Sequence, residues 1–152
     1  MKSALLAQIR TELKDSLERL SKAAREAHAA ATDPGSKAEG KYDTRSLEAS
    51  YLAAGQARRV DELAETIRIF EGVTLPDFDI DDAIDAGALV EVEMNGETSL
   101  LLLVPTAGGM SVNHHGEEIT LLTPASPLYQ KLIGMHTGES IDQDDLLVIE
   151  VR

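Results

Sequence analysis

Two apolar stripes that mirror each other constrain the first half of this chain more than any other feature. The first stripe advances in steps of three and four residues and consists of Leu6, Ile9, Leu13, Leu17, Leu20, Ala24, Ala27 and Ala31. The second stripe advances in the same way and consists of Ala49, Ala53, Ala57, Val60, Leu63, Ile67 and Phe70. This spacing places apolar side chains on one face of an α-helix, so each stripe predicts one helix.

The two predicted helices match each other as the arms of an antiparallel hairpin. When Leu6 is set opposite Phe70 and Ala27 opposite Ala49, the numbers of facing residues add up to 76 or 77 along the whole stripe. The centre of this reflection lies near Ala38. Facing residues of an antiparallel pair have a constant sum, so we expect a coiled-coil hairpin.

Breaking residues define the limits of the hairpin. The sequence Thr-Asp-Pro-Gly at 32–35 interrupts the first helix, because proline cannot continue a helix and glycine adopts turn conformations. Gly72 is a suitable residue to end the second helix. We therefore expect an arm over residues 1–72 with its tip near 32–43. About 28 residues per helix would give the arm a length on the order of 40 Å, and its alanine seam predicts a taper toward the tip.

The outer faces of the two predicted helices are polar. Arg10, Lys14, Asp61 and Glu65 lie off the apolar stripes, which disfavours a second copy of the chain packed against the hairpin. We expect a monomer in which the arm reaches into a partner. A dimerisation hairpin is the alternative.

The second half, residues 73–152, has the pattern of a small β domain with one short helix. Residues 88–104 predict a β-hairpin, because Asn95-Gly96 is a preferred two-residue turn between alternating strands. Ser126 and Pro127 suit the start of a short helix that Gly134 ends. Further strands are expected at 110–112, 119–122 and 146–151, and a linker or edge segment at 73–85. The expected fold class is α+β.

Charge is divided unevenly between the halves. Residues 1–71 hold 12 Lys and Arg against 12 Asp and Glu, whereas residues 72–152 hold 2 against 15. An acidic surface repels nucleic-acid phosphates, so direct binding of duplex DNA is disfavoured. The acidic half suits either docking on a basic protein or a solubilising surface. The lack of cysteine and of a long apolar run predicts a cytoplasmic protein without disulfides, thiolate metal sites or membrane contact.

With this layout the chain resembles the GreA/GreB-like transcription elongation factors. Ser126-Pro127-Leu128, Leu132-Ile133-Gly134 and Gly138-Glu139 are similar to the signature helix and turn of that family. Residues 37–42, Lys-Ala-Glu-Gly-Lys-Tyr, and the following Leu47-Glu48-Ala49 are similar to its tip region. The resemblance implies an FKBP-like antiparallel β domain that docks on bacterial RNA polymerase through Ser126, Pro127, Leu128 and Gly134.

The same resemblance implies that the coiled coil enters the secondary channel of the polymerase. Acidic tip residues there help to hold the Mg²⁺ of the polymerase during cleavage of backtracked RNA. The chain would bind no metal or cofactor stably and would have no catalytic residue of its own. It would modulate or at most stimulate the polymerase's own cleavage activity, with indirect contact to the 3′ end of the nascent RNA.

The tip residues of this chain depart from the family pattern. Glu39 matches the tip glutamate, but Ser36 stands where the partner aspartate is expected and lacks its charge. Tyr42 matches a tip tyrosine only after a shift of one residue. Asp33 and Asp43 could replace the missing carboxylate, or could simply form a turn and a helix cap. Lys37 and Lys41 would support the tip.

These departures leave a second function open within the same class. A non-cleaving regulator of the secondary channel, of the Gre-antagonist or Rnk type, is the alternative to cleavage stimulation. A prolyl isomerase or chaperone module is less favoured, because aromatic residues make up only 3% of the chain and such active sites need an aromatic-lined pocket.

Three local features have ordinary explanations. His114-His115, beside Glu117 and Glu118, is interpreted as a polar turn, since adjacent strand residues point to opposite faces and rarely bind one metal. Gly108-Gly109 is interpreted as a turn. Arg58-Arg59 is interpreted as a solvated helix face, with a contact to the channel wall as the alternative.

Overall fold

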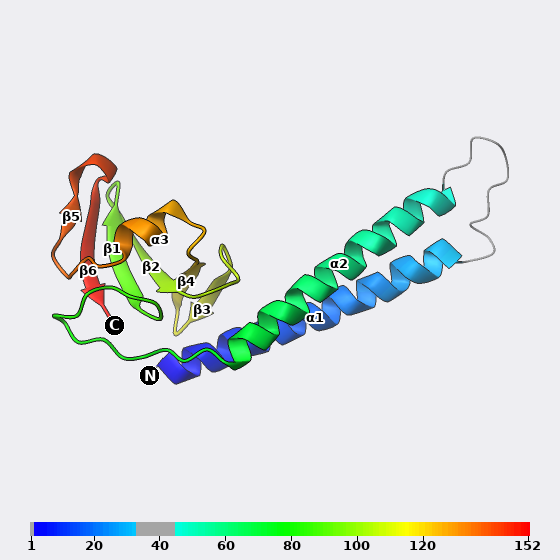
Figure 1. Ribbon diagram of the computed structural model, residues 1–152, viewed down its shortest axis with the longest axis horizontal. Coiled ribbons are helices and arrows are strands. Elements are labelled where there is room, and N and C mark those ends of the chain that lie inside the picture. Colours follow the sequence, from blue (N-terminus) through cyan, green and yellow to red (C-terminus); the bar gives the residue numbers. More distant parts are fainter. Residues whose placement is uncertain (1, 33–44) are drawn as a thin grey trace. The chain divides into compact units, whose positions relative to one another are not determined.

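The computed structural model describes residues 2–32 and 45–152 (Figure 1). The described elements are two long helices, then a sheet domain with one short helix and one 3₁₀ helix. Their bounds are α1 Lys2–Thr32, α2 Arg45–Glu71, β1 Leu89–Met94, β2 Glu97–Leu103, β3 Ser111–His114, β4 Glu117–Leu122, α3 Pro127–Leu132, β5 Ser140–Ile141, η2 Asp142–Asp144 and β6 Leu146–Val151. The expected α+β fold class, a helical hairpin followed by a β domain, is confirmed.

Contacts between Cα atoms divide the chain into two units. The helical unit is Gln8–Glu71, and the sheet unit combines Met1–Ala7 with Gly72–Arg152. The first turns of α1 thus belong with the sheet, although the rest of that helix belongs to the hairpin.

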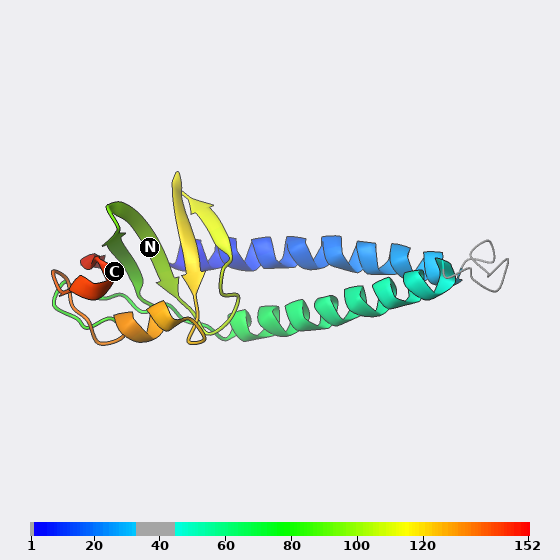
Figure 2. The ribbon, with the colours of Figure 1, turned by 90° about the horizontal axis from the view of Figure 1, so that it is seen from above.

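The apolar stripes form the interior of the helical unit where they carry large side chains. Ile9, Leu13, Ile67 and Phe70 are buried, as the stripe pattern requires. Figure 2 shows α1 and α2 running alongside each other as the two arms of the hairpin. The guanidinium of Arg10 donates hydrogen bonds to the backbone oxygens of Phe70, at 2.9 Å, and Glu71, at 3.3 Å. The end of α2 is therefore held by a side chain of α1.

Where the stripes consist of alanine, the two helices do not pack as closely as the sequence predicts. A hollow of about 710 Å³ lies between the helices and is lined by Ala24, Arg25, His28, Ala29, Ser50, Ala53, Ala54 and Ala57. Small side chains permit close helix packing, but they do not fill the space when the backbones stay apart. The predicted taper of the arm, with the two helices close together along their alanine residues, is therefore wrong in this stretch.

The sheet unit holds one six-stranded mixed sheet in the order β3-β4-β2-β1-β6-β5. Its neighbouring strands are antiparallel except for β2 and β4, which run parallel with Leu100 opposite Ile119. The β3–β4 hairpin turns back so that β4, not β3, lies next to β2. This return makes the sheet mixed, whereas an antiparallel sheet was expected.

Two hairpins in the sheet, β1–β2 and β3–β4, close with two-residue turns. Asn95 and Gly96 have φ values of 54° and 79°, and His115 and Gly116 have values of 53° and 82°. Positive φ at both central positions is the type I′ geometry that suits the twist of paired strands. The predicted turn at Asn95-Gly96 is confirmed. The second histidine of His114-His115 also lies in a turn.

The core of the sheet unit lies on one face of the sheet. Val90, Val92 and Leu103 point from β1 and β2 into this core, where Tyr129 and Leu132 of α3 cover them. The other face also buries side chains, among them Leu100, Leu102 and Ile119. Strand β2 is consequently buried on both sides, which explains its continuous run of leucines.

The segment from 73 to 85, expected to be a linker or an edge, contains neither helix nor strand. It is nevertheless part of the sheet unit, because Ile84 is only 1% exposed within the core. The backbone N–H of Ile84 donates to the oxygen of Met135, and the N–H of Gly134 donates to the oxygen of Ile84, both at 2.8 Å. These bonds fix the segment against the end of α3.

Candidate docking site

The site begins at Ser126, the residue that precedes α3. Ser126 has extended backbone angles, φ −80° and ψ 130°, and Pro127 follows at the start of the helix. Proline suits this position because its fixed φ is already helical and its missing N–H has no partner there. The Ser126 side chain makes no cap hydrogen bond.

A groove runs along this end of α3. It has a volume of about 580 Å³ and is lined by Met94, Asn95, Ser126, Pro127, Leu128, Lys131, Gln143, Asp144 and Asp145. The lining comes from the β1–β2 turn, from α3 and from η2 with the residue after it. The structure thus brings Ser126, Pro127 and Leu128 together with residues that lie far away in the sequence.

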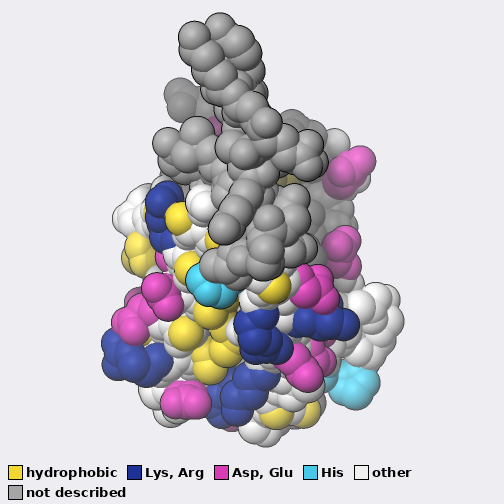
Figure 3. All heavy atoms as spheres, turned by 90° about the vertical axis from the view of Figure 1, so that its right-hand side faces the viewer, with side chains coloured by type: hydrophobic (Ala, Val, Ile, Leu, Met, Phe, Trp, Pro, Cys, Tyr) yellow, Lys and Arg dark blue, Asp and Glu magenta, His cyan; other side chains and the backbone are white. Residues whose placement is uncertain are grey.

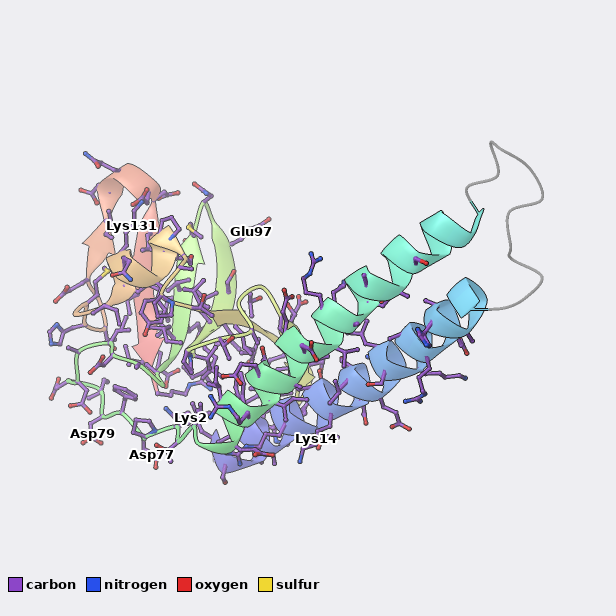
Figure 4. The ribbon with its side chains drawn as sticks, turned by 45° about the vertical axis from the view of Figure 1, so that its right-hand side comes forward. Lys2, Lys14, Asp77, Asp79, Glu97 and Lys131 are labelled. Atoms are coloured by element: carbon purple, nitrogen blue, oxygen red, sulfur yellow. The ribbon has the colours of Figure 1, made fainter. Side chains whose placement is uncertain are left out.

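One ion pair marks the wall of this groove. The Lys131 ammonium donates to both carboxylate oxygens of Asp144, at 3.0 and 2.9 Å. Figure 4 labels Lys131 on α3. Both side chains are partly exposed, at 47% and 31%, so water screens the pair and it adds little stability. The pair can exchange for contacts with a partner at low cost.

Gly134, the fourth residue expected to dock, is not among the residues that line the groove. It ends the turn after α3 with φ 86°, a conformation that glycine adopts without strain. Its N–H bond to Ile84 ties this turn to the segment before the sheet. The structure thus gives Gly134 a role in shaping the end of α3.

Tyr129 lies beneath α3 and is 7% exposed. Burial raises the pKa of its phenol, and the charge of Asp85 adds to this effect. No aromatic side chain lines the groove itself.

The predicted tip residues lie outside the described part of the chain. This holds for the metal-assisting candidates Glu39, Asp33 and Asp43, and for the supporting residues Ser36, Lys37, Lys41 and Tyr42. Among residues 2–32 and 45–152, no group of three His, Cys, Asp or Glu side chains could hold a metal ion.

On the helical unit, Arg58 and Arg59 are exposed, as a solvated face requires. They line a shallow depression of about 380 Å³ with Leu52, Gly55, Gln56 and Glu62. On the face drawn in Figure 3, Lys and Arg side chains are interspersed with Asp and Glu side chains.

Two basic residues have roles that sequence reasoning missed. The stripe pattern predicts Arg10 on a polar outer face, but its guanidinium binds the end of α2. Lys2 is 6% exposed and its ammonium donates to the backbone oxygens of Gly87, at 3.0 Å, and Arg152, at 2.8 Å. A lysine at the start of an amphipathic helix gives no sign of such burial.

Comparison with known proteins gives structural matches only. No protein-family model matches the chain. No curated protein matches it either. No helix in the described ranges is long and apolar enough to cross a membrane.

The structural matches are to GreA homologues. GreA factor homolog 1 (Gfh1) of Thermus thermophilus is 20% identical, with 94% of each chain covered and a TM-score of 0.37. Gfh1 of Thermus aquaticus is also 20% identical, with 93% of this chain and 92% of that chain covered and a TM-score of 0.36. A further solved structure, of the transcription factor Gfh1, is 20% identical, with 94% of this chain and 92% of that chain covered and a TM-score of 0.36.

Proposed function

We propose that this protein is a Gre-type transcription factor that binds bacterial RNA polymerase and inserts its helical hairpin into the secondary channel. The observation that carries the proposal is the hairpin itself. Its helices have 31 and 27 residues, so the shorter one extends over about 40 Å. Its interior is apolar only along one seam, and its residues carry equal numbers of acidic and basic groups. A narrow, charge-balanced rod of this length is suited to enter a channel.

The groove beside α3 is the proposed contact of the sheet unit with the polymerase. Leu128 offers an apolar side chain there, and Lys131 and Asp144 offer charges that are only weakly engaged with each other. An apolar centre with a polar rim is the usual anatomy of a protein interface. The acidic surface around the groove favours a basic partner surface and faster association with it.

At the tip, the proposed role of Glu39 is to help hold the Mg²⁺ of the polymerase. The factor would then stimulate or modulate cleavage of backtracked RNA by the polymerase, without turnover of its own. Ser36 favours the second candidate, a regulator that occupies the channel without stimulating cleavage, because a neutral hydroxyl is a much weaker ligand for Mg²⁺ than a carboxylate.

A binding experiment tests the docking proposal. The protein is immobilised and exposed to bacterial RNA polymerase core enzyme at moderate salt. We expect Leu128→Gln to weaken binding, whereas Ile80→Gln, at a residue 70% exposed outside the groove, leaves it unchanged. Thermal melts of both variants check that the fold is intact. Absence of binding by the wild-type protein would rule out the proposed function as a whole.

A transcript-cleavage experiment then separates the two candidates. Backtracked elongation complexes are incubated with wild-type protein or Glu39→Ala at several Mg²⁺ concentrations. A cleavage stimulator shortens the RNA in a Mg²⁺-dependent way, and Glu39→Ala abolishes this effect. A channel regulator binds equally well but slows cleavage, with or without Glu39. Stimulation that survives Glu39→Ala would show that the tip assignment is wrong.

A further inference from the structure

One large apolar side chain of the helical unit is exposed instead of packed in the hairpin. Leu52 of α2 is 57% exposed, and no other large hydrophobic side chain described in residues 8–32 and 45–71 is exposed to this degree. Single exposed leucines are common on protein surfaces, so Leu52 is informative only through the residues around it.

Leu52 lies in a depression that α2 forms alone. The depression has a volume of about 380 Å³, and all six residues that line it belong to this helix: Leu52, Gly55, Gln56, Arg58, Arg59 and Glu62. Leu52, Gly55 and Arg59 follow one another in steps of three and four, which places them on one face of the helix. The apolar stripe toward α1 runs through different positions. This surface, which we call the Leu52 face, is therefore a second face of α2.

Gly55 forms a notch in the middle of the Leu52 face. Glycine in the interior of a helix lowers its stability relative to alanine. At Gly55 an added Cβ would meet no atom within 4 Å, so packing within the described chain does not require a glycine. Its φ is not positive, so the backbone conformation does not require one either. A glycine in such a place lets the backbone of another molecule come close to the helix.

Two arginine residues border this notch. Arg58 and Arg59 are exposed, and neither guanidinium makes an ion pair or a hydrogen bond with another described residue. Glu62 is the one acidic residue of the Leu52 face, so this face has a net positive charge, whereas residues 1–71 as a whole are neutral. Guanidinium groups bind carboxylates through charge-assisted, often paired, hydrogen bonds. The charge of the face therefore favours an acidic partner.

The remaining side chains favour an acidic protein helix over an RNA strand. Phosphates would pair with Arg58 and Arg59, but Leu52 offers them nothing and the carboxylate of Glu62 repels them. A helix uses the whole face. Packed helices lie roughly 8–10 Å apart, and a glycine in the contact permits the lower end of that range. The Leu52 face extends over about 15 Å along α2, which is about three helical turns.

We propose that the Leu52 face is the surface by which the arm contacts RNA polymerase, and that its partner is an acidic helix of the polymerase. An apolar side chain of that helix packs on Leu52, its backbone crosses α2 at Gly55, and its carboxylates bind Arg58 and Arg59. The inference rests on the proposed function and specifies which face of the arm makes the contact and the chemistry of its partner.

The first test changes the shape of the face. The dissociation constant of the full-length protein and polymerase core enzyme is measured for each variant. Leu52→Gln should weaken binding about tenfold, because a leucine buried in the contact is lost. Gly55→Met should weaken binding at least as much, because its side chain fills the notch. The matched controls, Ile80→Gln on the sheet unit and Ala64→Met at an exposed position of α2 outside the depression, should bind like the wild type.

Loss of binding in Gly55→Met is not explained by unfolding, because methionine is a better helix former than glycine. Thermal melts of all variants verify this. Wild-type affinity in both Leu52→Gln and Gly55→Met, or an equal loss in their controls, would overturn the inference and leave the proposed function standing. Absence of binding by the wild-type protein would overturn both.

The second test changes the charge of the face. Arg59→Gln should weaken polymerase binding about tenfold, because a hydrogen bond between charged groups is lost. Arg59→Glu should weaken it further by repulsion. Arg19→Gln, the same change at an exposed arginine of α1, should have little effect. A labelled single-stranded RNA is titrated in parallel without polymerase. RNA binding that Arg59→Gln abolishes, or equal losses in Arg59→Gln and Arg19→Gln, would overturn the acidic helix as the partner.

Discussion

Replacement of Arg10 by methionine tests whether the hairpin is closed at the end of α2 as the structure shows. Methionine keeps a long apolar side chain but removes the guanidinium. The variant therefore loses the two hydrogen bonds to the oxygens of Phe70 and Glu71 without removing the packing of the side-chain stem. The last carbonyls of α2 also lose a positive charge near the negative end of the helix dipole.

The expected cost follows from these interactions. A hydrogen bond from a charged donor contributes about 1.5–3 kcal/mol, and a cation at a helix C-terminus about 0.3–1 kcal/mol. The bond to Glu71 is long at 3.3 Å and exposed, so its contribution is small. The bond to Phe70 at 2.9 Å is partly buried and dominates. We expect Arg10→Met to lower the free energy of unfolding of the helical unit by about 2 kcal/mol.

Urea unfolding followed by far-ultraviolet circular dichroism measures this loss, because α1 and α2 supply most of the helical signal. The matched control is Arg68→Met, since Arg68 lies in the last turn of α2 and, among the described residues, pairs with the exposed Glu65. This control loses only an exposed ion pair and a helix-end charge, so it should lower the midpoint much less than Arg10→Met does. A wild-type midpoint for Arg10→Met, or an equal shift in both variants, would refute the assigned role of Arg10.

Three further changes test other parts of the structure. Ile84→Ala should lower the unfolding free energy of the sheet unit by about 2–4 kcal/mol in chemical denaturation, because it leaves a cavity in the core, whereas Ile80→Ala should not. In calorimetry, Gly55→Ala should stabilise the helical unit by about 0.5–1 kcal/mol, because its added Cβ meets no atom within 4 Å, while Gly116→Ala should cost about 1 kcal/mol through its φ of 82°. Burial lowers the pKa of Lys2 below its ordinary value of 10.5, so the unfolded chain binds more protons between the two pKa values. Urea titrations should therefore show stability rising with pH across that interval, relative to Lys2→Met.

The periodic features of the chain were predictable from the sequence because they arise from local geometry. The matching stripes from Leu6 to Phe70 identify the hairpin, since helix periodicity and antiparallel pairing leave one solution. Asn95-Gly96 identifies a turn because few residue pairs accept positive φ at both positions. Ser126 and Pro127 mark the start of α3 for a similarly local reason.

Other features depend on contacts that no local pattern records. The parallel neighbours β2 and β4 result from the way β3 and β4 fold back on the sheet, a choice made by packing over the whole unit. The groove beside α3 needs the β1–β2 turn and η2 to meet it, and their residues are far apart in the sequence. Ile84 lies in a segment whose composition is that of a linker, yet its side chain is buried in the core.

The sequence by itself determined that this protein has a two-helix hairpin and a separate acidic β domain, because periodicity and charge are properties of the linear chain. Only the tertiary structure decided how its basic residues are used. Arg10 holds the end of α2, and Lys2 binds the backbone oxygen of Arg152 although 150 positions separate them. The physical reason is that a charged group gains its role from the groups that replace its water, and folding alone brings those groups together.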